Sequence, residues 1–286
     1  MRTRLTRARL IRRVAATLRV ISALLGILTV APGLTGADRE GQEGQSALRS
    51  SGSVRREAPG RMQARVDLAV ADYNDTIGRV MAGRGSVEQA FAKVHELEHL
   101  LISERDEDHL SALERMSEIE LAQFAVRLPG VRLWSSETIG VEIDPAFFQD
   151  LAEKHGTAAD RMFVRNYRLT YPIAYGWPDY VEPVTDLSGC TTYGGGELTN
   201  AYARWSTYAS RYPGHYATDV GQILEDVSNR LIAPVCACGD AGSVRRELSN
   251  FVTRLPNEQI TPKVRQRLKA IAAGQTSEIR FNCLPG

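Results

Sequence analysis

The sequence predicts a mainly α-helical protein, with a bundle-like N-terminal part, a disulfide-braced helical C-terminal part and at most a short β-hairpin. Apolar residues recur every three or four positions over most of the chain, which is the spacing of one helical face. A strand-like pattern bounded by turn residues is confined to one short segment. All four cysteines occur at or after residue 190, which places the disulfides in the C-terminal part.

Residues 1–37 have the composition of a signal peptide. They contain seven arginines and no acid, and an uncharged run from Val20 to Leu34 precedes the small residues Thr35-Gly36-Ala37, which suit a signal peptidase. The run is 15 residues long, shorter than the ~20 that span a bilayer. The alternative is an uncleaved anchor. We expect an exported protein, periplasmic or extracellular, that meets a membrane only through this segment if it is uncleaved.

Removal of the signal peptide changes the charge of the chain. It leaves 28 basic and 34 acidic residues, a net charge of −6, which argues against nucleic acid as a partner because binding to phosphates needs a basic face. Residues 38–60 are rich in Gly, Ser and charge and contain no aromatic residue. They cannot bury enough apolar surface to offset ordering entropy, so we expect a flexible linker.

Residues 61–130 are predicted to form an acidic three-helix segment. The first helix covers Arg61–Gly83, and Ser86 caps a second that continues to about Glu104. The third is expected to begin at Asp106–Asp108, where acids favour a helix N-terminus. Pro129-Gly130 ends it.

Residues 131–286 are predicted to form an aromatic-rich, disulfide-containing helical region that packs with residues 61–130 as one body. Residues 131–143 suit a hairpin, and Asp144-Pro145 begins a helix to about His155. Residues 171–196 contain three prolines and five glycines, which favour a loop with short strands. The remaining expected helices cover 158–167, 197–211, 216–231, 243–254 and 262–273.

The cysteines predict two disulfides. Export and an even count favour disulfide bonding. Cys236 and Cys238 are two residues apart, a spacing that rarely meets disulfide geometry. Cys190 is therefore expected to bond one of them and Cys283 the other. A four-thiolate zinc site is the alternative.

The pentapeptide His95-Glu96-Leu97-Glu98-His99 resembles the zincin motif. The resemblance covers these five residues alone. It implies that His95 and His99 bind zinc and that Glu96 is the general base on metal-bound water. The third ligand would come from a following helix. On a helical wheel, Glu98 and Glu120 fall inside the apolar stripes of the second and third helices, and Glu120 is the expected third ligand because a buried carboxylate needs a partner or a metal.

Aromatic crowding predicts a binding surface. Nine of the ten tyrosines fall between residues 167 and 216. Four aromatic residues gather in a proline-containing loop, where function tends to concentrate; they are Tyr171, Tyr175, Trp177 and Tyr180. Such rings stack on sugars and protein partners. Separately, Gly194-Gly195-Gly196 before a helix could form an anion-binding nest or a hinge.

The favoured function is a non-enzymatic binding role at the cell envelope or outside the cell, with a protein or glycan partner and no cofactor. The alternative is a zinc-dependent hydrolase that uses His95, His99 and Glu120, with Glu96 as base and zinc as cofactor.

Overall fold

The structure, a computed structural model, describes residues 59–135, 139–172, 177–185 and 188–275, together with residues 277, 279 and 280. The predicted signal peptide and nearly all of the predicted linker lie outside these residues. Helices account for 63% of the structure and strands for 10%, which confirms the predicted fold class. Among the described residues, no helix is both long and apolar enough to cross a membrane.

The N-terminal part is built on an antiparallel helix pair. These helices are α1 (Pro59–Met81) and α2 (Val87–Glu98), and α2 continues as a short π-helix, η1 (His99–Ser103). The predicted cap is present, since the Ser86 side chain accepts a hydrogen bond from the backbone N–H of Gln89 at 3.4 Å. The predicted hairpin is present as β1 (Val131–Ser135) and β2 (Ile139–Ile143), which pair antiparallel.

The third predicted helix is shorter than expected. Helix α3 covers only Glu118–Val126, and residues 104–117 form turns. The cause is the buried carboxylate of Asp106, which accepts the backbone N–H groups of Asp108 (2.9 Å) and Leu110 (3.1 Å) and binds Arg115. These bonds compete with the helical ladder. A capping box between Ser117 and Glu120 then starts α3.

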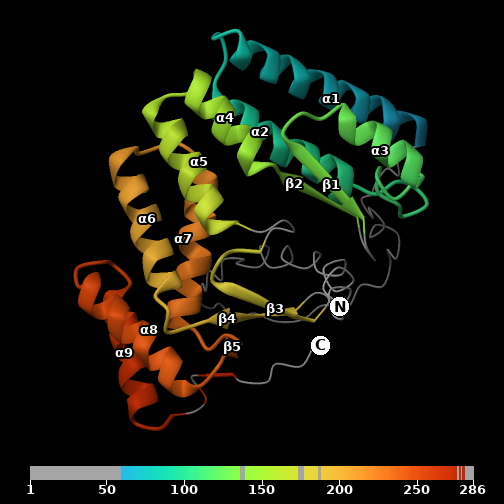
Figure 1. Ribbon diagram of the computed structural model, residues 1–286. Coiled ribbons are helices and arrows are strands. Elements are labelled where there is room, and N and C mark those ends of the chain that lie inside the picture. The colour runs from blue at the N-terminus through green and yellow to red at the C-terminus, as the bar shows by residue number, and fades with distance from the viewer. Residues whose placement is uncertain are drawn as a thin grey trace, which may run out of the picture.

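Helices α4 (Pro145–His155) and α5 (Ala158–Thr170) connect the two parts (Figure 1). Asp144 caps α4 and Pro145 occupies its first turn, as the sequence predicted. Four further helices follow in the C-terminal part: α6 (Glu197–Arg211), α7 (Ala217–Ile232), α8 (Ala241–Arg254) and α9 (Thr261–Ala272). All four lie within two residues of their predicted bounds.

The C-terminal part also contains a small sheet that exceeds the single predicted hairpin. Strand β3 (Val181–Thr185) pairs antiparallel with β4 (Ser188–Thr192), which pairs parallel with β5 (Ala237–Cys238). The order is therefore β3-β4-β5. The parallel pair brings the chain after α7 back beside β4.

One hydrophobic core runs through both parts. Its centre is aromatic: the ring of Phe163 on α5 stacks on Tyr216 at 3.6 Å between centroids and meets Phe91 of α2 edge-on at 5.0 Å. The edge-on contact of Phe163 with Phe91 is a favoured aromatic geometry. Tyr216 thus belongs to the packing between the parts.

Candidate functional site

His95 lies between two carboxylates from different elements. Its Nε2 is 2.8 Å from Oδ1 of Asp219 on α7, and its Nδ1 is 3.5 Å from Oε2 of Glu98 on α2. Burial disfavours the imidazolium, but the hydrogen bonds and charges of Asp219 and Glu98 outweigh it and raise the pKa of His95 to about 9. At neutral pH this side chain is a cation in an ion-paired cluster, whereas a zinc ligand must be neutral.

The other residues of the predicted zinc site lie elsewhere. His99 is 67% exposed and 3.8 Å from Glu104, and Glu96 binds Lys93 at 2.6 Å. Glu120 is exposed, and its carboxylate accepts the N–H and hydroxyl of Ser117 at 2.8 and 2.7 Å. The helical wheel misplaced Glu120 because it assumed a helix that starts near residue 106. Among the described side chains, His95, His99 and Glu120 do not form a group that could share one ion.

The aromatic loop does not form an exposed patch over its described residues. Tyr180 is fully buried, Trp177 is 9% exposed, and Tyr171 packs half-buried on the core with its ring 4.7 Å from Tyr167. Tyr175 lies outside the described residues. Burial raises the pKa of the Tyr171 and Tyr180 hydroxyls. The sequence could not separate a surface loop from a loop folded into the core.

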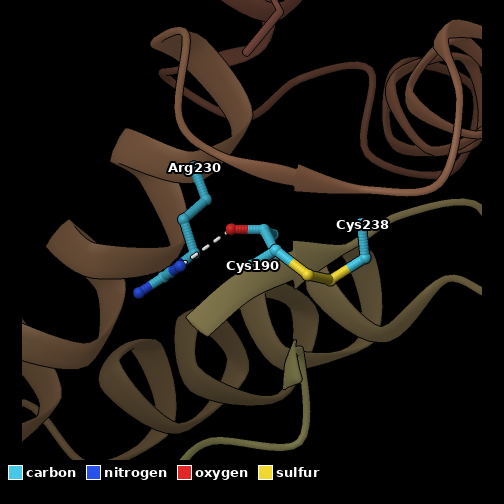
Figure 2. Close-up of a disulfide and its surroundings, with 4 residues drawn as sticks. Cys190, Arg230 and Cys238 are labelled. Atoms are coloured by element: carbon cyan, nitrogen blue, oxygen red, sulfur yellow. Dashed lines mark hydrogen bonds between the residues drawn. A yellow bond between two sulfur atoms is a disulfide. The ribbon is translucent and has the colours of Figure 1, made fainter. Parts of the chain in front are cut away.

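Tyr180 belongs to a polar network beneath the small sheet. Its hydroxyl donates to Asp226 at 2.9 Å, and Asp226 also accepts from Nε of Arg230 at 2.9 Å. Arg230 lies over the Tyr180 ring and donates to the hydroxyl of Thr191 at 2.8 Å. This network fixes β3 and β4 against α7, and Figure 2 shows its Arg230 beside the Cys190–Cys238 disulfide.

The structure joins Cys190 to Cys238 in a disulfide, with the Cα atoms 5.1 Å apart. Cys236 is also disulfide-bonded, and Cys283 lies outside the described residues. The prediction that Cys190 pairs with one of the two close cysteines is confirmed, and the choice is Cys238. Disulfides persist in oxidising compartments, so this bond indicates a location outside the reducing cytoplasm.

The disulfide lies beside a carboxylate. Glu182 Oε and the sulfurs of Cys190 and Cys238 lie within 4.8 Å of one another, the one group of three candidate metal-binding residues within the described ranges. This group was not predicted from the sequence, because Glu182 and Cys190 come together only when β3 pairs with β4.

The glycine nest before α6 is real, and it holds a carboxylate of the chain itself. Glu247 of α8 is fully buried and accepts the N–H groups of Gly194 (3.1 Å), Gly196 (2.8 Å) and Thr199 (3.0 Å). The hydroxyl of Thr199 donates a fourth bond at 2.8 Å. A positive φ of 91° at Gly196 gives the backbone the left-handed turn that aims these groups. The nest is therefore closed to external anions.

Helix α3 carries an apolar surface that the sequence analysis did not identify. Ile119 is 72% exposed and Val126 is 87% exposed. Together with Ala122 they lie on one face of the helix, because positions 119, 122 and 126 are three and four residues apart. A shallow groove of about 300 Å³ adjoins this stripe. Its lining residues are Glu118, Leu121, Ala122, Ala125 and Leu133. We call this stripe and groove the α3 face.

In comparisons with known proteins, no family model, curated protein or solved structure matches the chain. The function is therefore argued from the side chains alone.

Proposed function

We propose that the chain is an exported protein with a non-enzymatic binding role, and that it contacts a protein partner at the cell envelope through the α3 face. The observation that carries this proposal is the exposure of Ile119 and Val126 beside a groove lined by Glu118 and four aliphatic residues. Exposed apolar side chains that gather on one helix face typify protein interaction sites, whereas isolated ones are common on any surface.

The chemistry of the α3 face favours a protein over a glycan. Sugar recognition relies on aromatic platforms with polar tips, and the described loop aromatics are buried or packed on the core. The α3 face instead offers aliphatic side chains, which suit the apolar stripe of a partner segment. Glu118 at the groove has no ion pair among the described residues, so it favours a basic residue beside the partner's apolar ones.

The alternative, a zinc-dependent hydrolase, has less support. It needs two histidine nitrogens and a carboxylate at one point with a water position open to substrate. His95 is bound to Asp219, and the His99 ring is directed to Glu104. The described contacts therefore favour binding over hydrolysis.

Site-specific photo-crosslinking in cells that export the chain tests this proposal. A benzophenone side chain at position 126 should give an adduct of one defined size, because the partner covers that position. The same group at Leu169, which is 50% exposed on α5, is the matched control and should give none. Glu118→Lys should weaken the adduct by placing like charges together.

Three results would contradict the proposal. They are the absence of an adduct at both positions 119 and 126, equal adducts at 126 and 169, and an adduct with the mass of two copies of this chain. Ile119→Glu and Val126→Glu should leave thermal stability within about 0.5 kcal/mol, since exposed positions tolerate polar residues. A lost adduct in these variants then reports binding rather than unfolding.

A further inference from the structure

Three residues that can bind a metal ion, one from each strand, meet on the small sheet. Glu182 stands directly opposite Cys190 across the β3–β4 ladder, so both side chains lie on one face. Cys238 of β5 pairs with Thr192 in the parallel register. The carboxylate and the two sulfurs lie within 4.8 Å of one another. Glu182 is exposed and Cys238 is partly exposed, so this corner is open to solvent.

In the disulfide the two sulfurs carry no thiolate charge and do not bind a metal ion as ligands. We propose that reduction of the Cys190–Cys238 disulfide converts this corner into a binding site for Zn²⁺ or a similar borderline-soft divalent ion. The ligands are the two thiolates and the carboxylate of Glu182. The site lies on β3–β5, so it is independent of the partner-binding role proposed for the α3 face.

The reaction balances with a phosphine as reductant. The phosphine attacks one sulfur and breaks the S–S bond, and water then gives the phosphine oxide and two protein thiols. Binding of the divalent ion releases both thiol protons and leaves two metal–sulfur bonds. A dithiol reductant reaches the same two thiols by exchange and becomes a cyclic disulfide.

The frame of the site does not depend on the disulfide alone. The backbone N–H of Thr191 donates to Cys236 at 2.8 Å, and Arg230 holds the Thr191 hydroxyl at 2.8 Å. Two thiolates on one zinc lie roughly 3.7 Å apart, given Zn–S bonds of about 2.3 Å in a tetrahedron. Rotation of the two cysteine side chains on a fixed backbone can supply that separation.

The ligand set selects the class of ion. Thiolates favour zinc and related ions, whereas Mg²⁺ and Ca²⁺ prefer oxygen ligands. Three protein ligands leave a fourth tetrahedral position for water.

Cobalt titration of the full chain tests the proposal, because Co²⁺ substitutes for Zn²⁺ and reports thiolate ligation and tetrahedral geometry by its absorption bands. Cys236→Ser/Cys283→Ser is used as the background so that Cys190 and Cys238 are the only thiols. After phosphine reduction, one Co²⁺ per chain should bind with sulfur-to-metal bands, and Zn²⁺ should displace it. The unreduced protein should bind none at this site.

Variants assign the ligands. Glu182→Gln should weaken Co²⁺ binding about tenfold or more, a loss on the scale seen when a metal site loses a supporting group. Glu225→Gln, an exposed acid on α7, is the matched control and should bind as the background does. Cys190→Ser should abolish the sulfur bands, with far-UV circular dichroism as the check on folding.

The proposal is overturned by any of three results: no sulfur-to-metal bands after reduction, equal binding with the disulfide intact, or binding that is unchanged in Glu182→Gln. Glu182→Gln and Glu225→Gln keep both Cys190 and Cys238, so a failure to bind in them cannot come from loss of the disulfide during folding.

Discussion

A single buried carboxylate organises the start of α6. The N-cap of this helix is Gly196, which has no side chain to accept the free N–H groups. Glu247 reaches across from α8 and takes that role, with four hydrogen bonds to residues 194–199. A carboxylate at a helix N-terminus also interacts favourably with the helix dipole. The α6–α8 contact is therefore polar at its centre although it is fully buried.

Glu247→Gln should destabilise the fold by about 2 kcal/mol, since an amide has one acceptor oxygen and leaves buried N–H donors unpaired. For a chain of this size that corresponds to a fall of roughly 4–8 °C in Tm. Thermal unfolding followed by circular dichroism measures it. Glu225→Gln serves as the exposed control, and an equal Tm for both variants would show that the four bonds contribute little.

Individual side chains were the hardest feature to predict. The glycine run was compatible with either a nest or a hinge, and nothing in the local sequence pointed to Glu247, which lies 51 residues after Gly196. Glu120 was placed inward because its helix was assumed to start too early. Both errors have one origin, since the partner of a charged side chain is set by tertiary contacts that a local pattern does not contain.

At the scale of elements, predictions succeeded where the sequence carries capping residues. Ser86 before α2 and Asp144-Pro145 before α4 fixed the starts of both helices. The helix predicted to start near residue 106 was wrong for residues 104–117. Asp106, an acid compatible with a helix start, instead binds the backbone of its own loop. The α3 face was missed because a helix that exposes apolar residues has the same composition as one that buries them.

Two histidine–carboxylate pairs connect α2 to the segment that begins α7. His95 binds Asp219 at 2.8 Å, and Glu88 binds His215 at 2.9 Å and the backbone N–H of Tyr216. Burial, and then the charges of Tyr171, Asp219 and Glu98, raise the pKa of the Tyr167 hydroxyl, so Tyr167 on α5 lies within the field of the His95 cluster. This contact between the two parts therefore contains a titratable cation.

The stability that His95 contributes should depend on pH. Its pKa rises from 6.5 to about 9 on folding, so protonation favours the folded state. The contribution is complete below about pH 6.5 and is lost as the pH rises through 9. The Tm difference between the wild type and His95→Gln should be largest near pH 6 and should shrink towards pH 10.

His99→Gln is the matched control, because the His99 ring is exposed and lies 3.8 Å from its nearest carboxylate. The pH window stays above 5, where carboxylates of an unfolded chain are largely ionised. A difference between wild type and His95→Gln that grows with pH would contradict the assigned ion pairs.

At the scale of the whole molecule, the mainly helical class followed from periodicity, and the two parts were expected to pack as one body, but the three-stranded sheet was not predicted. Short strands were expected within residues 171–196, where β3 and β4 lie, but β5 pairs with β4 residues that are 46 positions earlier in the chain, so no local pattern indicates that pairing. The aromatic residues of the Tyr171–Tyr180 loop were expected to form a binding surface, whereas Tyr216, further along the chain, packs against Phe163 and Phe91 and joins the two parts.

The Cys190–Cys238 disulfide should contribute substantially to the stability of the C-terminal part. It encloses α6 and α7 in a loop with a sequence separation of 48 residues. The chain-entropy estimate for such a loop is about 4 kcal/mol, because the cross-link restricts the unfolded chain. Cys190→Ser/Cys238→Ser should therefore lower Tm by roughly 8–16 °C for a chain of this size.

Differential scanning calorimetry of that double variant and of the wild type, both without reductant, measures this contribution. Adding the phosphine to the Cys236→Ser/Cys283→Ser chain should produce a similar fall in Tm. If the thiolates and Glu182 bind Zn²⁺, its addition should then restore part of the lost Tm, since a ligand that binds only the folded state stabilises it. A double variant with wild-type Tm would mean that the β4–β5 ladder and the Tyr180–Asp226–Arg230 network hold this corner without the covalent bond.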